Sequence, residues 1–138
     1  QASGDMKMRF VGEKEGIDER LLALMADAEQ ETASRKGTTV NLAVNYGGRQ
    51  EIVSAVNSLI AEGKTTVTED DISSKMYTSP DCDLIIRPSG EERLSNFLLW
   101  QAAYSEFWYS DVLWPDFKNE DLYAALSEFE KRNRRFGG

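Results

Sequence analysis

Hydrophobic and polar residues follow two different periods along this chain, and the change from one to the other predicts strands and helices in turn. A period of two indicates a strand with one covered face, and a spacing of three to four indicates the apolar stripe of a helix. We expect strands at residues 6–11, 39–46, 83–87 and 107–109. We expect helices at residues 17–35, 52–63, 68 onward, 95–104 and 119–135.

The order of these elements favours an α/β layered fold with a largely parallel central sheet flanked by helices. Residues 84–86 are an uninterrupted apolar triplet, which is typical of a strand buried on both faces in a parallel sheet. Residues 95–104 are apolar nearly all round, so we expect a central, buried helix there. Thr68 and Asp71 have the spacing of a helix N-cap with an acidic first turn, and Asn119 is expected to cap the last helix.

Composition narrows the chemistry that this chain can carry. Its 138 residues, 41% of them hydrophobic, suit one domain. A net charge of −8 repels nucleic acid and anionic membranes, so an anionic ligand needs a local basic cluster. Because histidine is absent and Cys82 is the only cysteine, His-based triads, internal disulfides and paired-cysteine metal sites are excluded. No apolar run reaches the length of a membrane span, and we expect a soluble, cytoplasmic protein.

The best candidate for such a basic cluster is the segment that follows the strand at 83–87. Arg87 ends this strand, Gly90 allows a close backbone approach, and Arg93 adds a second guanidinium. Ser95 offers a hydroxyl and an amide at the expected start of a helix. Ligands of open α/β sheets collect at the carboxyl ends of strands, and paired arginines suit a diphosphate. The alternative is that these arginines form ion pairs with Glu91, Glu92 or other acids.

Other polar motifs leave more than one interpretation open. Glu106 would lie roughly 16 Å from Ser95 on a straight helix, so it approaches the same site only if it belongs to the next strand. There it could hold Mg²⁺; otherwise it is a surface acid. Asn45–Arg49 (NYGGR) is a phosphate-binding or a turn motif, and Asp81 with Asp83 indicates turn chemistry. An aromatic cluster at Trp100–Trp114 suits a core or a subunit interface better than a ligand tunnel.

Several long motifs, taken together, resemble the cis-prenyltransferase family, most closely its bacterial undecaprenyl diphosphate synthase branch. They occur in the family's order and extend over nearly all of the chain from about Lys7. The motifs are Asp83–Gln101 (DLIIRPSGEERLSNFLLWQ), Ala103–Phe107 (AYSEF), Asp111–Phe117 (DVLWPDF), Asn45–Arg49 (NYGGR) and Arg134–Gly138 (RRFGG). Members of this family condense isopentenyl diphosphate with an allylic diphosphate and form cis double bonds.

The resemblance assigns substrate-binding roles to residues of the candidate site. It implies that Arg87, Arg93 and Ser95 hold the diphosphate of isopentenyl diphosphate, with Gly90 and Leu94 beside them. No residue of this chain is expected with confidence to act as the catalytic group.

The resemblance also implies a cofactor and partners. Glu106 is expected to help to bind Mg²⁺ associated with the diphosphate. The chain is expected to form a homodimer in which Arg135 and Gly137 reach the partner's active site. The second substrate is an allylic prenyl diphosphate, and the polyprenyl product, a cell-wall lipid carrier precursor, would lie close to a membrane. No nucleic acid partner is expected.

One part of the family pattern is missing from these residues. The Asp-Gly-Asn-Gly-Arg motif, which holds the allylic diphosphate and the metal in the family, does not occur. We therefore expect residues 6–138 to be the carboxyl-terminal part of a single cis-prenyltransferase domain, with the amino-terminal part missing. Residues 1–5 resemble nothing in the family and are expected to be an added or disordered start. The chain alone is expected to be inactive and to bind isopentenyl diphosphate weakly.

Two other functions stay open on the sequence. The chain could be a non-catalytic scaffold subunit that pairs with a complete prenyltransferase, although a scaffold would not need a complete isopentenyl diphosphate site. It could also be another α/β enzyme that binds phosphate.

Overall fold

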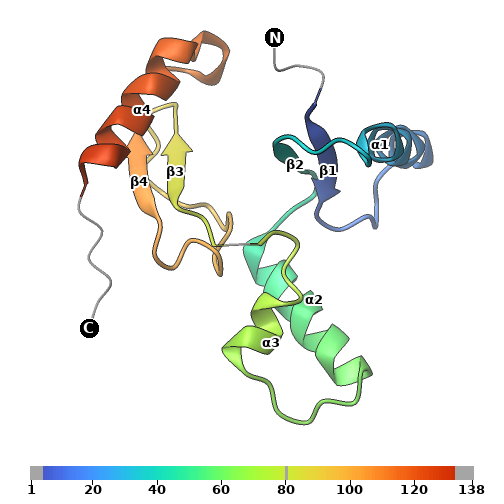
Figure 1. Cartoon of the computed structure of the whole chain (residues 1–138). Coiled ribbons are helices and arrows are strands. Elements are labelled where there is room, and N and C mark those ends of the chain that lie inside the picture. Colours follow the sequence, from blue (N-terminus) through green and yellow to red (C-terminus); the bar gives the residue numbers. More distant parts are fainter. Residues whose placement is uncertain (1–4, 80, 133–138) are drawn as a thin grey trace. The chain divides into compact units, whose positions relative to one another are not determined.

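The structure is a computed structural model that describes residues 5–79 and 81–132 (Figure 1). The chain forms two compact units, residues 1–78 and residues 79–138, and each is described by itself. Arg135 and Gly137, which the resemblance assigns to substrate binding, lie outside the described residues. Among the residues described, every helix is too short or too polar to cross a lipid bilayer.

Unit 1 is built on two parallel strands. β1 (Lys7–Val11) pairs with β2 (Thr39–Ala43) in a register that joins Lys7 to Thr39 and Val11 to Ala43. Both expected strands are confirmed, although β2 ends three residues early because Asn45 takes a left-handed φ of 49°. Gly12 follows β1 at a φ of 127°, where an added Cβ would lie 2.0 Å from the Val44 carbonyl oxygen. Because of this positive φ and this close approach, only glycine fits at position 12.

Helix α1 (Glu19–Thr32) is the crossover between the two strands, and its side chains satisfy the outer edge of β1. The Met8 N–H donates to Thr32 Oγ1 at 3.0 Å, and the Phe10 N–H donates to Glu29 Oε1 at 2.7 Å. These amides alternate with those that face β2, so α1 covers an edge that another chain could otherwise extend. The Asp18 side chain caps the helix by accepting from the Arg20 N–H.

Two further helices complete unit 1. α2 (Gly48–Ala61) begins four residues before the expected start and ends just before Gly63, which takes a φ of 87°. α3 (Glu69–Ser73) has the expected N-cap at Thr68, because Thr68 and Asp71 exchange hydrogen bonds between side chain and backbone at 3.2 and 3.0 Å. The buried apolar side chains of the unit are Val11, Met25, Ala55 and Leu59.

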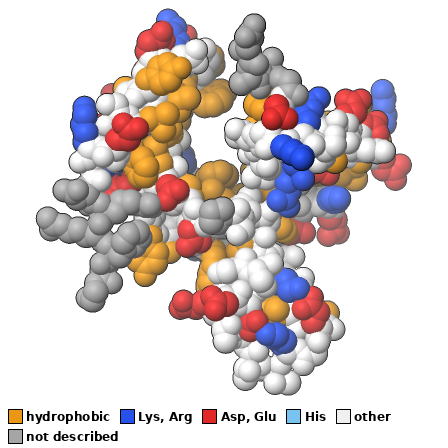
Figure 2. Space-filling view, viewed as in Figure 1, with side chains coloured by type: hydrophobic (Ala, Val, Ile, Leu, Met, Phe, Trp, Pro, Cys, Tyr) orange, Lys and Arg blue, Asp and Glu red, His pale blue; other side chains and the backbone are white. Residues whose placement is uncertain are grey.

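Unit 2 is also built on two parallel strands, but it has fewer elements than unit 1. β3 (Leu84–Arg87) and β4 (Glu106–Tyr109) pair in parallel, with Leu84 opposite Glu106 and Arg87 opposite Tyr109. A 3₁₀ turn, η1 (Trp114–Asp116), leads to α4 (Asn119–Lys131), which packs against β4. Ile85, Ala102 and Ala125 are its buried apolar residues. Figure 2 shows a band of hydrophobic side chains over α4 and β4.

Two local predictions in unit 2 are wrong. Residues 95–104 form successive turns and not a helix, because Ser95, Asn96 and Leu98 take left-handed φ values of 49°, 64° and 47°. A helix that is apolar all round needs cover on every side. Phe97 and Tyr104 remain 41% and 64% exposed, so the described part of unit 2 does not supply that cover.

The second correction concerns the cap of α4. Its N-cap is Lys118 and not Asn119, which is the first helical residue. The carboxylate of Asp121 accepts from the Lys118 N–H at 2.8 Å, so the acidic first turn supplies the capping bond. The α/β fold with parallel strands and helices is confirmed. Within the described residues the strands pair as two two-stranded sheets, one in each unit.

Candidate functional site

The turn after β3 fixes where the side chain of Arg87 begins. Ser89 and Gly90 take left-handed φ values of 78° and 68°. Their N–H groups donate to the carbonyl oxygens of Val112 and Ser110, at 2.8 and 2.9 Å. This segment after β4 therefore holds the turn in place. A Cβ at Gly90 would approach the Asp111 carboxylate at 3.1 Å, so backbone conformation and space both favour glycine there.

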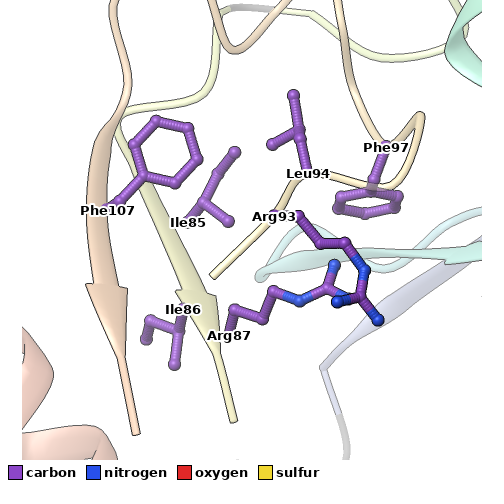
Figure 3. Close-up of a pocket in the computed structure, with 7 residues that line it drawn as sticks. All are labelled: Ile85, Ile86, Arg87, Arg93, Leu94, Phe97 and Phe107. Carbon is purple, nitrogen blue, oxygen red and sulfur yellow. The ribbon is translucent and has the colours of Figure 1, made fainter. Parts of the chain in front are cut away.

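A cavity of about 70 Å³ opens beside Arg87 on one face of the strand pair (Figure 3). Two arginines reach it, Arg87 from the end of β3 and Arg93 from the turns that follow. In Figure 3 their guanidinium groups converge. The residues that line the cavity are Ile85, Ile86, Arg87, Arg93, Leu94, Phe97 and Phe107. Sequence reasoning thus found three of the lining residues, Arg87, Arg93 and Leu94, and missed the apolar wall.

Strand alternation explains why the cavity has one charged end. Successive side chains of a strand point to opposite faces. Ile85 and Arg87 therefore share a face, and Phe107 shares it too because it lies opposite Ile85 in the register. The ring of Phe107 stacks on that of Tyr109, the residue opposite Arg87, with centroids 5.9 Å apart. Apolar residues thus line the middle of this face, and Arg87 stands at its carboxyl end.

Ser95 lies beside Arg87, but not as the cap of a helix. The Nη2 of Arg87 donates to Ser95 Oγ at 3.4 Å, a long hydrogen bond. Ser95 is exposed and sits in a turn, so the expected amide at a helix start is not present. The hydroxyl remains next to the guanidinium, where both groups can face the same anion.

Arg93 forms an ion pair with a neighbouring acid, which is the alternative that the sequence left open. Its guanidinium forms an ion pair with the Glu91 carboxylate, and the two side chains are 65% and 40% exposed. Exposed ion pairs contribute little free energy and exchange readily with other partners. This pairing therefore does not prevent Arg93 from binding an anion in the cavity.

Within one chain, Glu106 lies away from Arg87 and Arg93. It belongs to β4, as the metal hypothesis required, but its register partner is Leu84 at the start of β3. Arg87 is three residues further along, about 10 Å at the usual rise of a strand, and on the opposite face. Membership of β4 therefore does not bring the Glu106 carboxylate to the Arg87 cavity.

Arg132, the C-cap of α4, contacts Glu106 on that opposite face. Arg132 Nη1 donates to Glu106 Oε2 at 3.0 Å and to the Phe107 carbonyl at 2.8 Å. Its Nη2 donates to Glu128 Oε1 at 2.5 Å, and Glu128 also accepts from the Trp108 indole at 3.0 Å. Hydrogen bonding to Arg132 lowers the pKa of Glu128, and the two carboxylates raise the pKa of Arg132. We call these four side chains the Arg132 cluster.

The described residues do not form a magnesium site of their own. Mg²⁺ prefers several oxygen ligands in near-octahedral geometry. Across residues 5–79 and 81–132, no three carboxylate or cysteine side chains lie close enough to share an ion. Glu106 also gives one oxygen to Arg132, which makes it a single carboxylate with a competing cation.

A second polar cluster, which sequence reasoning missed, lies at the carboxyl ends of the strands of unit 1. Glu51 is only 1% exposed and accepts from the Tyr46 hydroxyl at 2.5 Å and from the Tyr77 N–H at 2.7 Å. The Tyr77 hydroxyl donates to Glu13 at 2.5 Å. Burial, followed by the hydrogen bond to Glu13, raises the pKa of Tyr77. The Asn45 amide donates to the carbonyls of Glu13 and Glu15, both at 3.1 Å.

This second cluster gives the NYGGR motif a structural role. Asn45 and Tyr46 hold the loop after β1, and Gly47 is the N-cap of α2. A carboxylate one helical turn after a glycine pair was the available signal for Glu51. The cluster is internally hydrogen-bonded, so we read the motif as a turn motif.

Comparison with known proteins places the whole chain in one family. Residues 1–137 match the family model described as "Putative undecaprenyl diphosphate synthase". Isoprenyl transferase of Clostridium acetobutylicum is 48% identical over 139 residues, which cover 93% of this chain and 54% of that protein. Isoprenyl transferase of Fusobacterium nucleatum is 49% identical over 135 residues, which cover 96% of this chain and 59% of that protein.

Two crystal structures share the fold. A probable undecaprenyl diphosphate synthase from Campylobacter jejuni has a TM-score of 0.92 at 29% identity, covering 99% of this chain and 65% of that chain. Lavandulyl diphosphate synthase from Lavandula x intermedia, in complex with dimethylallyl diphosphate, has a TM-score of 0.90 at 35% identity, covering 97% and 61%. The chain thus spans about half the length of the curated relatives it matches. The resemblance seen in the motifs is confirmed, and this chain belongs to the undecaprenyl diphosphate synthase family of cis-prenyltransferases.

Proposed function

We propose that this chain is the isopentenyl diphosphate-binding part of a cis-prenyltransferase. The complete enzyme would condense isopentenyl diphosphate with an allylic prenyl diphosphate to give a cis-polyprenyl diphosphate. The observation that carries the proposal is the convergence of Arg87 and Arg93 on one partly apolar cavity at the end of β3.

The charge arrangement of the cavity supports a diphosphate as the ligand. Two guanidinium groups that converge repel each other unless an anion lies between them, and their planar forks match phosphate oxygens. The Ser95 hydroxyl, beside Arg87, adds a neutral donor. The chain as a whole carries a charge of −8, so this local pair of cations is an exception to its general field.

The proposal of a second substrate rests on a solved relative. The proposal that the chain alone is inactive rests on a missing motif. The lavandulyl diphosphate synthase structure holds dimethylallyl diphosphate, an allylic diphosphate, which supports such a substrate for the whole protein. The Asp-Gly-Asn-Gly-Arg motif does not occur in these residues, so we propose that the chain alone forms no product.

Mg²⁺, the homodimer and the location remain predictions from the resemblance. Glu106 would help to bind Mg²⁺ in competition with Arg132, which holds its Oε2, and the other ligands would come from the diphosphate or from outside the described residues. Arg135 and Gly137 are proposed to bind substrate across a homodimer. We propose a cytoplasmic protein whose polyprenyl product lies close to a membrane.

Calorimetric titration of the purified chain with isopentenyl diphosphate tests the diphosphate site. Arg87→Ala and Arg93→Ala should each weaken binding at least about tenfold, because each removes a charge-assisted hydrogen-bonding group. Arg20→Ala, an exposed arginine of α1, is the matched control and should bind like the parent chain. Unchanged affinity in both cavity variants would reject the site.

Radiolabelled isopentenyl and farnesyl diphosphates test the second half of the proposal. We expect no polyprenyl product from the 138-residue chain. Product formation by the chain alone would show that the allylic half of the site is not needed.

A further inference from the structure

Glu106 is already paired with a cation of its own chain, and this pairing limits its availability to a metal ion. We infer that Arg132 is an exchangeable counter-ion of Glu106, which holds the carboxylate beside β4 and stays in place when the carboxylate turns to a divalent cation. This inference rests on the proposed role of Glu106 in Mg²⁺ binding and names the residue that regulates it. Since Arg132 acts through Glu106, it is a positioning residue.

The end of α4 brings the Arg132 side chain to β4. Arg132 is the C-cap of the helix, with an extended backbone at a φ of −79° and a ψ of 129°. Its guanidinium reaches Glu106, the first residue of β4 and 26 positions earlier in the chain, at 3.0 Å. The contact therefore joins the end of one element to the start of another.

Two other acceptors hold Arg132 independently of Glu106. Nη1 donates to the Phe107 carbonyl at 2.8 Å, and Nη2 donates to Glu128 Oε1 at 2.5 Å. The carbonyl belongs to the backbone of β4, and Glu128 also accepts from the Trp108 indole at 3.0 Å. If the bond to Glu106 is lost, the guanidinium therefore keeps two of these three partners.

The carboxylate of Glu106 is the part of this contact that can exchange partners. Its backbone is held in the sheet, where the Glu106 N–H donates to the Asp83 carbonyl at 2.9 Å. Its side chain is 30% exposed, and that of Arg132 is 33% exposed. Ion pairs that solvent can reach contribute little free energy, and ions from solution compete for them. A divalent cation could therefore compete for Glu106 without detaching α4 from β4.

Competition predicts a direction of change that a purely structural role does not. A guanidinium beside a carboxylate reduces the local negative potential and occupies one oxygen, so it weakens the binding of a second cation. Removing Arg132 should therefore tighten the binding of a divalent ion at Glu106, although it destabilises the fold. If Arg132 only braced α4 against β4, its removal would leave metal binding unchanged or weaken it.

Titration of the full chain with Mn²⁺ tests this direction, with the electron paramagnetic resonance signal reporting the free ion. Mn²⁺ accepts the octahedral oxygen sites that Mg²⁺ prefers. Because the chain has 24 acidic residues, the binding that depends on Glu106 is taken as the difference from Glu106→Gln. Arg132→Gln should tighten this part about two- to fivefold, the range that an accessible ion pair allows.

Two further variants separate the position of the charge from its presence. Lys131→Gln removes the same charge from the next residue, whose side chain is exposed, and should bind Mn²⁺ like the parent chain. Arg132→Lys keeps a cation at the position and should restore the weaker binding of the parent. Thermal unfolding of each variant checks that it is folded at the temperature of the titration.

A measurement on the parent chain does not depend on the stability of Arg132→Gln. In ¹⁵N-labelled protein, Mg²⁺ should shift the side-chain Nε–H resonance of Arg132, which is assigned by its absence in Arg132→Lys. The same addition to Glu106→Gln should leave that resonance where it was.

The outcomes separate the counter-ion from the proposed function. Equal Glu106-dependent binding in the parent chain and in Arg132→Gln would overturn the counter-ion and leave the metal role of Glu106 standing. If neither shows Glu106-dependent binding and the Arg132 resonance does not move, both the counter-ion and that metal role fail. The diphosphate site at Arg87 and Arg93 is judged separately, by titration with isopentenyl diphosphate in the absence of metal.

Discussion

The two units place polar side chains at the carboxyl ends of their parallel strands, but they satisfy them in different ways. In unit 1 the buried carboxylate of Glu51 is hydrogen-bonded by Tyr46 and Tyr77, and Tyr77 in turn donates to Glu13. In unit 2 the same position carries Arg87, with a 3.4 Å hydrogen bond to an exposed serine, and Arg93, in an exposed ion pair.

This difference shows where a ligand can contribute free energy. A buried cluster that already has its hydrogen bonds stabilises the fold, and a ligand there would have to displace them. Cations with only weak partners, such as half-buried Arg87 and exposed Arg93, lose little when an anion replaces those partners. The same α/β plan therefore has a structural polar cluster in unit 1 and a candidate binding site in unit 2.

The largest expected effect comes from breaking the cluster of unit 1. Glu51→Ala leaves the Tyr46 hydroxyl and the Tyr77 N–H without their buried acceptor, so we expect a loss of about 2–4 kcal/mol in unfolding free energy. Urea unfolding followed by circular dichroism measures it.

A matched variant sharpens the result. Glu62→Ala, on an exposed side chain in a surface ion pair just after α2, should cost much less. Equal effects of the two substitutions would mean that the buried cluster contributes no more than a surface pair.

An intermediate effect is expected from the Arg132 cluster, which is the structural counterpart within unit 2. Arg132→Gln removes three hydrogen bonds of the α4 C-cap, two to β4 and one to Glu128 of α4, and it should lower the unfolding midpoint by about 3–6 °C. Glu106→Gln should lower it less.

The double variant tests whether these two residues act together. Because they share one interaction, the double variant should be less destabilised than the sum of the single variants. If the change in unfolding midpoint of the double variant equals the sum of the changes of the single variants, Glu106 and Arg132 are not coupled. Glu106 would then be available for another role.

The smallest effect is a pH dependence present in both units. The pKa of Glu128 is lowered by Arg132, and the pKa of Asp71 is lowered first by Lys64 and then by the Thr68 N–H. A carboxyl with a lowered pKa in the folded state stabilises it above the ordinary value, 4.5 for Glu128, and loses that contribution as the pH falls.

Thermal unfolding at pH 7 and pH 3 measures this contribution. Glu128→Gln and Asp71→Asn should each lower the midpoint by about 1–3 °C at pH 7 and by less at pH 3. A difference from the parent chain that is the same at both pH values would contradict the assignment.

Much of the local structure could be predicted from sequence. A period-two pattern marked β1, and an uninterrupted apolar triplet marked β3. The Thr68–Asp71 spacing marked the start of α3, and Gly63 marked the end of α2. These features depend on neighbours within a few residues, so sequence spacing is enough to find them. Arg87 at the end of a buried strand was predicted for the same reason.

Other features depended on contacts between distant residues. The apolar wall of Phe97 and Phe107 requires two segments to meet across the cavity, and no spacing within either segment indicates it. Residues 95–104 have the pattern of a buried helix, but a pattern does not say which elements are present to surround it. Glu51 was missed because its donors come from separate loops.

By itself, the sequence determined the α/β class, the parallel order of strands and helices, the family and the arginine pair after β3. Only the tertiary structure decided that Glu106 faces Arg132 across β4 and not the arginine cavity, and that the cavity has an apolar wall. The reason is that alternation along a strand fixes which residues share a face, whereas the partner strand and its register decide what that face meets.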